Sequence, residues 1–135
     1  MNVQTFAKTV GDYGCLALCY LYIACLETNT KWDDIEALRI LKEAMSRGYI
    51  DSDCYVRDPV NLMKLATGKN FDVSKTTIGH ARSPYVCMRY EAGTKAHWTV
   101  WNVNSGLIWN SLDWSNCVTN GNPILSDVRD VVMRG

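Results

Sequence analysis

Residues 11–26 read GDYGCLALCYLYIACL, and this stretch decides how the chain folds. Its side chains are apolar or aromatic without interruption from Cys15 to Leu26. Within the run, an apolar stripe recurs at helical spacing, at positions 15, 18, 19, 22, 23 and 26. A helix that is apolar on every side is normally buried in the centre of a domain. We therefore predict a buried central helix that begins at Cys15.

An export signal is the other interpretation of this apolar run. A signal peptide carries a basic segment directly before its apolar core, but here Asp12 lies close to the run and Lys8 is the only base before it. No stretch of the chain reaches the roughly 18 apolar residues of a membrane span. We expect a core helix, and no membrane among the partners of the protein.

The composition is that of an ordinary globular domain. The chain has 135 residues, of which 47% are hydrophobic and 21% charged, so one domain over residues 1–135 is expected. The 14 basic residues balance the 14 acidic ones. A net charge near zero gives no electrostatic attraction for nucleic acid, and nucleic acid is therefore not expected as a partner.

Six cysteines raise the question of disulfides, and they are Cys15, Cys19, Cys25, Cys54, Cys87 and Cys117. An even number would suit a secreted disulfide framework, but the irregular spacing and the size of the domain favour free thiols in a reducing compartment, hence the cytoplasm. The sequence has no Cys-x-x-Cys pair, and its two histidines lie far from the cysteine-rich helix. We therefore expect no metal site and no cofactor.

Capping signals indicate two further helices after the central one. Thr30 is the predicted N-cap of the first, with acids in its first turn and Gly48 as its stop. In RDPVNLMKLATG, Asp58 is the expected cap, Pro59 the first helical residue and Gly68 the residue past the end.

The second half of the chain has the pattern of a β-sheet. Three segments rich in β-branched and aromatic residues, PYVCMRY, HWTVWNV and LIWNSLD, are separated by turn signals and predict an antiparallel three-stranded meander. The stretch from 123 to 135 predicts one more strand or a short closing helix. Helices followed by strands indicate an α+β domain in which the early helix packs on the later sheet.

The two histidines are the available bases for cysteine chemistry. His80 lies in a polar, turn-like stretch, whereas His97 starts a strong strand. For His97 we consider two alternatives, a hydrogen-bonded structural histidine and a general base placed at the rim of the sheet.

The register of the second hairpin decides what faces His97. A three-residue loop over 104–106, a type I turn closed by glycine, would pair Val103 with Leu107. His97 would then lie directly opposite Asp113, with Cβ atoms about 4.5 to 5.5 Å apart. The carboxylate would accept the imidazole Nδ1 proton and leave Nε2 for a nucleophile.

A two-residue loop is the alternative for this hairpin. It would shift the register by one residue and turn Asp113 to the other face of the sheet. Asn110 would then share the face of His97 and become the runner-up orienting residue.

Cys15 is the candidate nucleophile. A thiolate at a helix start faces unpaired backbone N–H groups and the positive end of the helix dipole. Gly11 and Gly14 allow a tight entry into the helix, while Cys19 and Cys25 lie deeper and are assigned to packing.

The order of these motifs resembles the papain-like cysteine peptidases. A glutamine near the N-terminus is followed by a cysteine that opens an apolar helix, a histidine at the head of HWTVW, and an acid at the end of WNSLD. The layout over residues 1–115 is most similar to the bacterial peptidases that process double-glycine leader peptides. The resemblance implies a papain-like fold, with N-terminal helices, a buried central helix and a C-terminal antiparallel sheet.

This resemblance also implies roles for individual residues. Cys15 would be the nucleophile, His97 the general base, Asp113 the orienting acid and Gln4 an oxyanion-hole donor. The reaction would be acyl transfer through a thioester, with a peptide or amide as substrate.

A binding or regulatory module with the same fold but no activity is the alternative function. Leu16 stands where the family has glycine, and Gln4 precedes Cys15 by eleven positions where the family has about six. The sequence does not set the oligomeric state.

Tryptophans cluster around the predicted hairpin, at Trp98, Trp101, Trp109 and Trp114. We assign most of them to the core or to cross-strand pairs. Trp98 and Trp114 are the candidates for lining a substrate groove.

Overall fold

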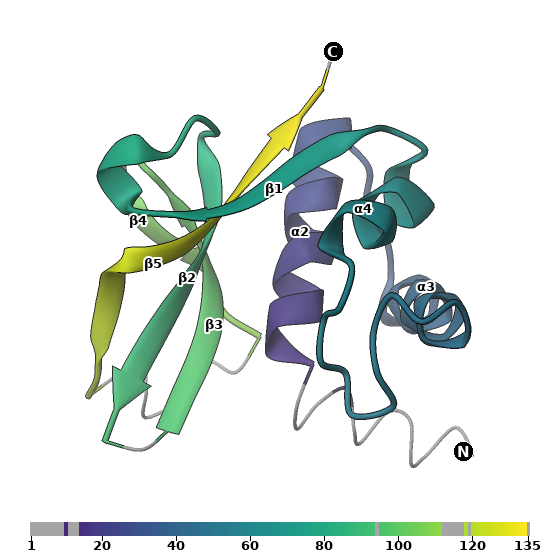
Figure 1. Cartoon of the computed structure of the whole chain (residues 1–135), viewed down its shortest axis with the longest axis horizontal. Helices are drawn as coiled ribbons and strands as arrows, with labels where there is room; N and C mark the ends of the chain where they lie inside the picture. Colours follow the sequence, from purple (N-terminus) through teal and green to yellow (C-terminus); the bar gives the residue numbers. More distant parts are fainter. Residues whose placement is uncertain (1–9, 11–13, 94, 112–117, 119, 135) are drawn as a thin grey trace.

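The computed structural model describes residues 10, 14–93, 95–111, 118 and 120–134. Within these residues, three α-helices pack on one face of a five-stranded antiparallel sheet (Figure 1). The helices are α2 (Cys15–Thr28), α3 (Asp34–Ser46) and α4 (Pro59–Thr67). The strands are β1 (Phe71–Thr76), β2 (Tyr85–Ala92), β3 (Lys95–Asn102), β4 (Gly106–Trp109) and β5 (Asn122–Met133). The prediction of an α+β domain with early helices on a later sheet is confirmed.

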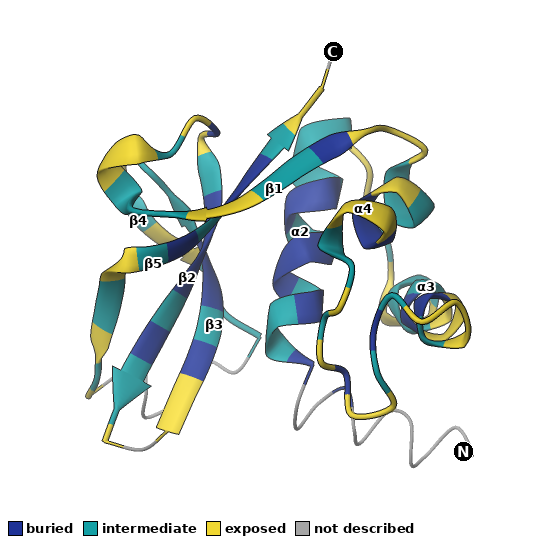
Figure 2. Cartoon of the chain, viewed as in Figure 1, coloured by how far each residue is buried: buried dark blue, intermediate teal, exposed yellow. Residues whose placement is uncertain are grey.

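Helix α2 is the central element, as its uniformly apolar sequence predicts. Ala17, Ile23 and Ala24 are fully buried, and Figure 2 shows most of the helix as buried or half-buried. The helix ends at Asn29, which adopts a left-handed conformation (φ 51°) and donates its backbone N–H to the Cys25 carbonyl. No helix in the described part of the chain is long and apolar enough to span a membrane.

The entry into α2 depends on close backbone contact at Gly14. The Gly14 N–H donates to the Val10 carbonyl at 2.8 Å. A Cβ atom on residue 14 would lie only 2.5 Å from that same carbonyl oxygen, which is closer than side-chain carbons approach backbone oxygens. Glycine at this position therefore lets the chain turn directly into the residue that opens the helix, Cys15.

The starts of α3 and α4 follow from carboxylate caps. The predicted cap Thr30 is wrong, because Asp33 caps α3 by accepting the Glu36 N–H at 2.8 Å from an extended backbone. For α4 the prediction is confirmed, since Asp58 accepts the Asn61 N–H. Gly68 ends α4 with a φ of 73°, a conformation that favours glycine.

The strand order in the sheet is β1-β5-β2-β3-β4. The predicted meander is confirmed as β2, β3 and β4, and the last predicted segment forms a strand rather than a helix. β5 lies between β1 and β2 and is antiparallel to both. Strand β1 was not predicted, because its sequence FDVSKT is half polar and only its first residue is fully buried.

The predicted register of the β3–β4 hairpin is wrong. Leu107 pairs with Trp101 instead of Val103, and Gly106 pairs with Asn102. The loop is therefore residues 103–105, because the Asn102 side chain accepts the Asn104 N–H and ends the strand early. A register shift between Val100 and Trp101 then changes the pairing again.

The two faces of the sheet carry different clusters of buried residues. Cys87, Val100 and Val131 face the helices, and Trp98 packs with them. The other face holds Val86, Met88, Tyr90 and Val128. Because side chains alternate along a strand, the three inner strands β5, β2 and β3 contribute to both clusters.

Candidate functional site

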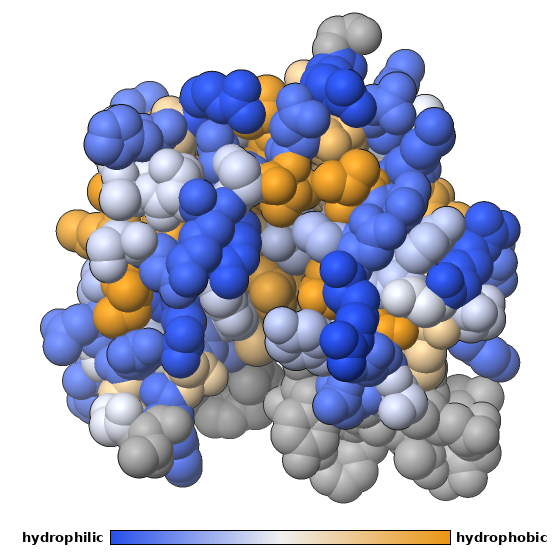
Figure 3. Space-filling view, in the orientation of Figure 1, coloured by the Kyte–Doolittle hydropathy of each residue, from blue (hydrophilic) through white to orange (hydrophobic). Residues whose placement is uncertain are grey.

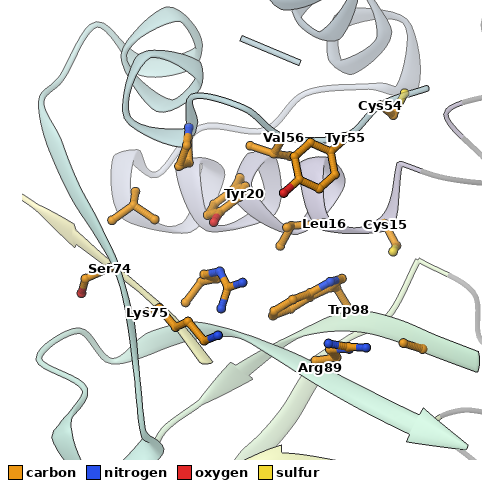
Figure 4. Close-up of a pocket in the computed structure, with 14 residues that line it drawn as sticks. Cys15, Leu16, Tyr20, Cys54, Tyr55, Val56, Ser74, Lys75, Arg89 and Trp98 are labelled. Atoms are coloured by element: carbon orange, nitrogen blue, oxygen red, sulfur yellow. The ribbon is translucent and has the colours of Figure 1, made fainter. Parts of the chain in front are cut away.

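A cavity of about 620 Å³ opens between the helices and the sheet. Its walls come from the start of α2, the segment 54–59 before α4, and strands β1, β2, β3 and β5. Figure 3 shows a hollow between the two halves of the molecule, with apolar side chains at its bottom and hydrophilic ones along its rims. Cys15 and Leu16 lie at one end of the cavity, and Ser74 and Lys75 lie at the other (Figure 4).

Cys15, the candidate nucleophile, lies where α2 meets β3. Burial raises the pKa of the Cys15 thiol above its usual value of 9.0, although the backbone N–H groups of Trp98, Leu16 and Cys15 itself lower it. These N–H groups would stabilise a negative charge on the sulfur, but the loss of water outweighs them. At neutral pH, Cys15 is therefore a protonated thiol.

His97, the candidate base, is held by Asn110. The imidazole is 4% exposed, and its Nε2–H donates to the Asn110 Oδ1 at 2.5 Å. Burial lowers the pKa of His97 below its usual value of 6.5, and the bond to Asn110 opposes this only in part. The ring is thus neutral at pH 7, with its proton on Nε2 and Nδ1 as the unprotonated nitrogen.

This arrangement corrects the predicted tautomer. The predicted hairpin places the orienting group at Nδ1 and leaves Nε2 for the cysteine, whereas in the structure Asn110 contacts Nε2. The runner-up Asn110 contacts the ring. The bulge between Val100 and Trp101 shifts the pairing with β4 by one residue, and this shift puts Asn110 on the same face as His97. Asp113, Gln4 and Trp114 lie outside the described residues.

The Cys15 sulfur and the His97 side chain lie on opposite faces of β3, next to the peptide group that joins His97 to Trp98. The sulfur lies near the Trp98 N–H, and His97 is the residue directly before Trp98. His97 pairs with Tyr90 on the face away from α2, whereas Trp98 packs toward α2. Within the described part of the chain, no hydrogen bond joins Cys15 to His97.

The remaining predicted residues divide between the cavity and the core. Trp98 lines the cavity, as expected of a groove residue. Trp109 stacks on Tyr22 with ring centroids 4.7 Å apart, and Trp101 donates its indole N–H to the Tyr90 hydroxyl. The five described cysteines are free thiols, and the described residues contain no group of three acidic, histidine or cysteine side chains that could hold a metal ion.

The basic side chains of the cavity were not predicted from the sequence. Lys75, Arg89 and Arg129 all line it, from three different strands. Their common location follows from the position of β5 between β1 and β2. Nothing in the local sequence indicates that position, because the two strands that flank β5 are about 40 to 60 residues earlier in the chain.

The fold and the site together define an α+β protein with a cysteine at the start of its buried helix and a cavity beside it. The chain belongs to the family described as "Protein of unknown function, DUF261", whose model matches residues 1–126. No curated protein and no solved structure matches the chain.

Proposed function

We propose that the protein is a cysteine-dependent hydrolase that cleaves a peptide or amide bond by acyl transfer, on a papain-like fold. One observation carries the proposal. The thiol at the start of α2 lines a cavity of ligand size and contacts the Trp98 N–H of β3, and the residue before Trp98 is His97, whose ring is hydrogen bonded to Asn110. A nucleophile, a base and an orienting group are the three parts that nucleophilic catalysis requires.

The protonation states define how such a reaction would start. A thiol and a neutral imidazole do not form an ion pair at rest, so His97 Nδ1 would take the Cys15 proton as the sulfur attacks the substrate carbonyl. Collapse of the tetrahedral intermediate would transfer that proton to the leaving amine and leave a thioester. Water, deprotonated by His97, would then attack the thioester carbonyl. The acid would be released, and His97 would return the proton to the sulfur.

Thiol and imidazole are close along β3 but lie on opposite faces of that strand. The Cα–C bond of about 1.52 Å and the peptide C–N bond of about 1.33 Å place the Trp98 nitrogen roughly 2.4 Å from the His97 Cα, and the sulfur lies near that nitrogen. The imidazole would therefore reach the sulfur only after the backbone at His97 rotates and turns the ring away from Tyr90. Catalytic hydrogen bonds are often long without substrate and tighten when it binds.

Alkylation by iodoacetamide at pH 7.5 tests this proposal. We expect Cys15 to react faster than the buried Cys19 and Cys87, and His97→Ala to slow Cys15 by on the order of 10²-fold, the smaller contribution typical of a positioned base. His80→Ala is the matched control and should change nothing, because His80 is exposed, is hydrogen bonded to Thr77 in the turn after β1 and does not line the cavity. Equal Cys15 rates in the wild type and in His97→Ala would refute the proposal.

A binding module that keeps the fold without the activity is the second candidate. It is favoured by the raised pKa of Cys15 and by the lack of a hydrogen bond between Cys15 and His97 in the described part of the chain. Under this function, Cys15→Ser would leave ligand affinity unchanged, and Cys15 would be no more reactive than an unfolded-chain thiol.

A further inference from the structure

The cavity beside Cys15 is lined by positive charge. Among the described residues that line it, the charged ones are Lys75, Arg89 and Arg129, and all three are cationic. They come from β1, β2 and β5, which are neighbours in the sheet. The surface of the sheet that faces α2 is therefore basic along the cavity, although the whole chain is neutral.

Two of these cations lie directly against each other. Lys75 pairs with Arg129 across β1 and β5, and like charges at opposed positions destabilise a sheet. Asp127 offsets this repulsion, with a carboxylate oxygen 2.5 Å from Arg129 Nη1 and another 3.8 Å from Lys75 Nζ. Arg89 has its own partner, Glu91, at 3.0 Å.

Counting these groups leaves one positive charge in excess. Three cations face two carboxylates, and neither Asp127 nor Glu91 is among the residues that line the cavity. Each cation has more N–H donors than its acidic partner occupies. Donors therefore remain for a ligand that carries a single negative charge.

The Trp98 ring holds one of the donors, the Arg129 guanidinium, in place. The Arg129 guanidinium lies over the Trp98 ring, 4.9 Å from its centroid, and a guanidinium held in this way loses little conformational freedom when it binds. Tyr55, which is 63% exposed, directs its ring into the opposite side of the cavity (Figure 4). A volume of about 620 Å³ is within the range of small-ligand sites.

We propose that this cavity binds a carboxylate, so that the substrate of the Cys15 site is a peptide or amide that also carries a carboxylate. This inference rests on the proposed function. The excess of one charge matches a carboxylate better than a phosphate dianion, and the arginines offer the forked geometry that carboxylates accept. Because Lys75 and Cys15 lie at opposite ends of the cavity, the carboxylate and the scissile carbonyl occupy different parts of the bound substrate.

Peptide binding to the Cys15→Ser protein tests this inference without any need for turnover. Three N-acetylated pentapeptides serve as probes: two are amidated at the C-terminus and carry a central Glu or a central Gln, and the third is an all-Ala peptide with a free C-terminal carboxylate. Titration is followed by NMR at the Trp98 indole N–H. We expect the Glu peptide, the free-carboxylate peptide or both to bind on the order of tenfold more tightly than the Gln peptide. Which of the two binds identifies the source of the carboxylate.

Charge variants locate the binding to the cavity. Arg89→Gln and Lys75→Gln should each reduce the preference for a carboxylate several-fold, and Arg129→Lys, which keeps the charge, should retain part of it. Arg39→Gln on α3 is the matched control, since Arg39 is an exposed arginine paired with Glu36, and it should leave the preference unchanged. Thermal melts show whether each variant is folded.

Two results would overturn the inference. One is equal affinity for the Glu, free-carboxylate and Gln peptides, and the other is an equal loss of preference in Arg39→Gln and the cavity variants. Either result leaves the His97-dependent alkylation of Cys15 untouched, so the inference can fail while the proposed function stands. A carboxylate preference in a protein with an inert Cys15 would instead point to the binding module.

Discussion

The bond between His97 and Asn110 sets which imidazole nitrogen is available for chemistry. Because Asn110 Oδ1 accepts the Nε2 proton, we predict that ¹⁵N NMR finds the wild-type ring neutral at pH 7.5, with its proton on Nε2. In Asn110→Ala the preference for this tautomer should weaken, and the His97-dependent part of Cys15 alkylation should fall at least severalfold. A wild-type ring protonated on Nδ1 would contradict this and would favour the carboxylate that the sequence indicates, Asp113.

The burial of His97 also has a consequence for stability in acid. The pKa of His97 is lowered in the folded protein, so between pH 6.5 and that lower value the unfolded chain binds more protons at this residue. The contribution of the neutral His97 to the free energy of unfolding is therefore complete above pH 6.5, and it is lost as the pH falls through the pKa of the folded state.

Urea unfolding at a series of pH values checks this prediction. The free energy of unfolding of the wild type should fall more steeply below pH 6.5 than that of His97→Gln, which cannot be protonated. His80→Gln should follow the wild type. Parallel curves for the wild type and His97→Gln would show that the folded state does not resist protonation of His97.

At the scale of elements, the start of α2 depends on the absence of a side chain at residue 14. A Cβ there would lie 2.5 Å from the Val10 carbonyl oxygen, so we predict that Gly14→Ala lowers the free energy of unfolding by about 1–3 kcal/mol, as overpacking does. Gly79→Ala is the matched control, because nothing lies within 4 Å of its Cβ position, and it should change stability by less than about 0.5 kcal/mol.

Chemical denaturation measures both glycine variants. Because Gly14 directly precedes Cys15, Gly14→Ala should also change the alkylation rate of Cys15. If Gly14→Ala and Gly79→Ala were equally stable, the close approach to Val10 would not constrain the helix start.

The same elements show what the sequence could predict and why. Helix α4 was predicted with its cap, because Asp58, Pro59 and Gly68 are local signals that act on the residues beside them. The register of the β3–β4 hairpin was not predicted correctly. The Asn102 side chain accepts the Asn104 N–H, and the loop lies one residue earlier than expected. The candidate nucleophile was found from its place at a helix start, but the face on which His97 lies depends on that register.

At the scale of the whole molecule, β5 holds the sheet together. It pairs with β1 on one side and with β2 on the other, so removing it leaves β1 without a partner strand and opens one edge of β2, which still pairs with β3. We predict that a chain truncated after residue 121 does not fold, whereas a chain that lacks only residues 134–135 does. Far-ultraviolet circular dichroism and NMR dispersion distinguish the two outcomes. A folded chain without residues 122–135 would contradict the central role of β5.

The basic cavity is a property of the whole fold rather than of any segment. Lys75, Arg89 and Arg129 are brought together only when β1, β5 and β2 are paired. Sequence patterns find pairs of residues that are close along the chain, such as capping residues. They do not find a cluster that depends on a late strand inserted between two earlier ones.

The central place of β5 also affects how the protein is made. A nascent chain on the ribosome can form α2, α3, α4 and the β2–β3 hairpin before residues 122–133 have been synthesised, but β1 and β2 then have open edges that can pair with other chains. Arg129 reaches the cavity only with that last strand. The proposed carboxylate site is therefore complete only when synthesis has passed β5.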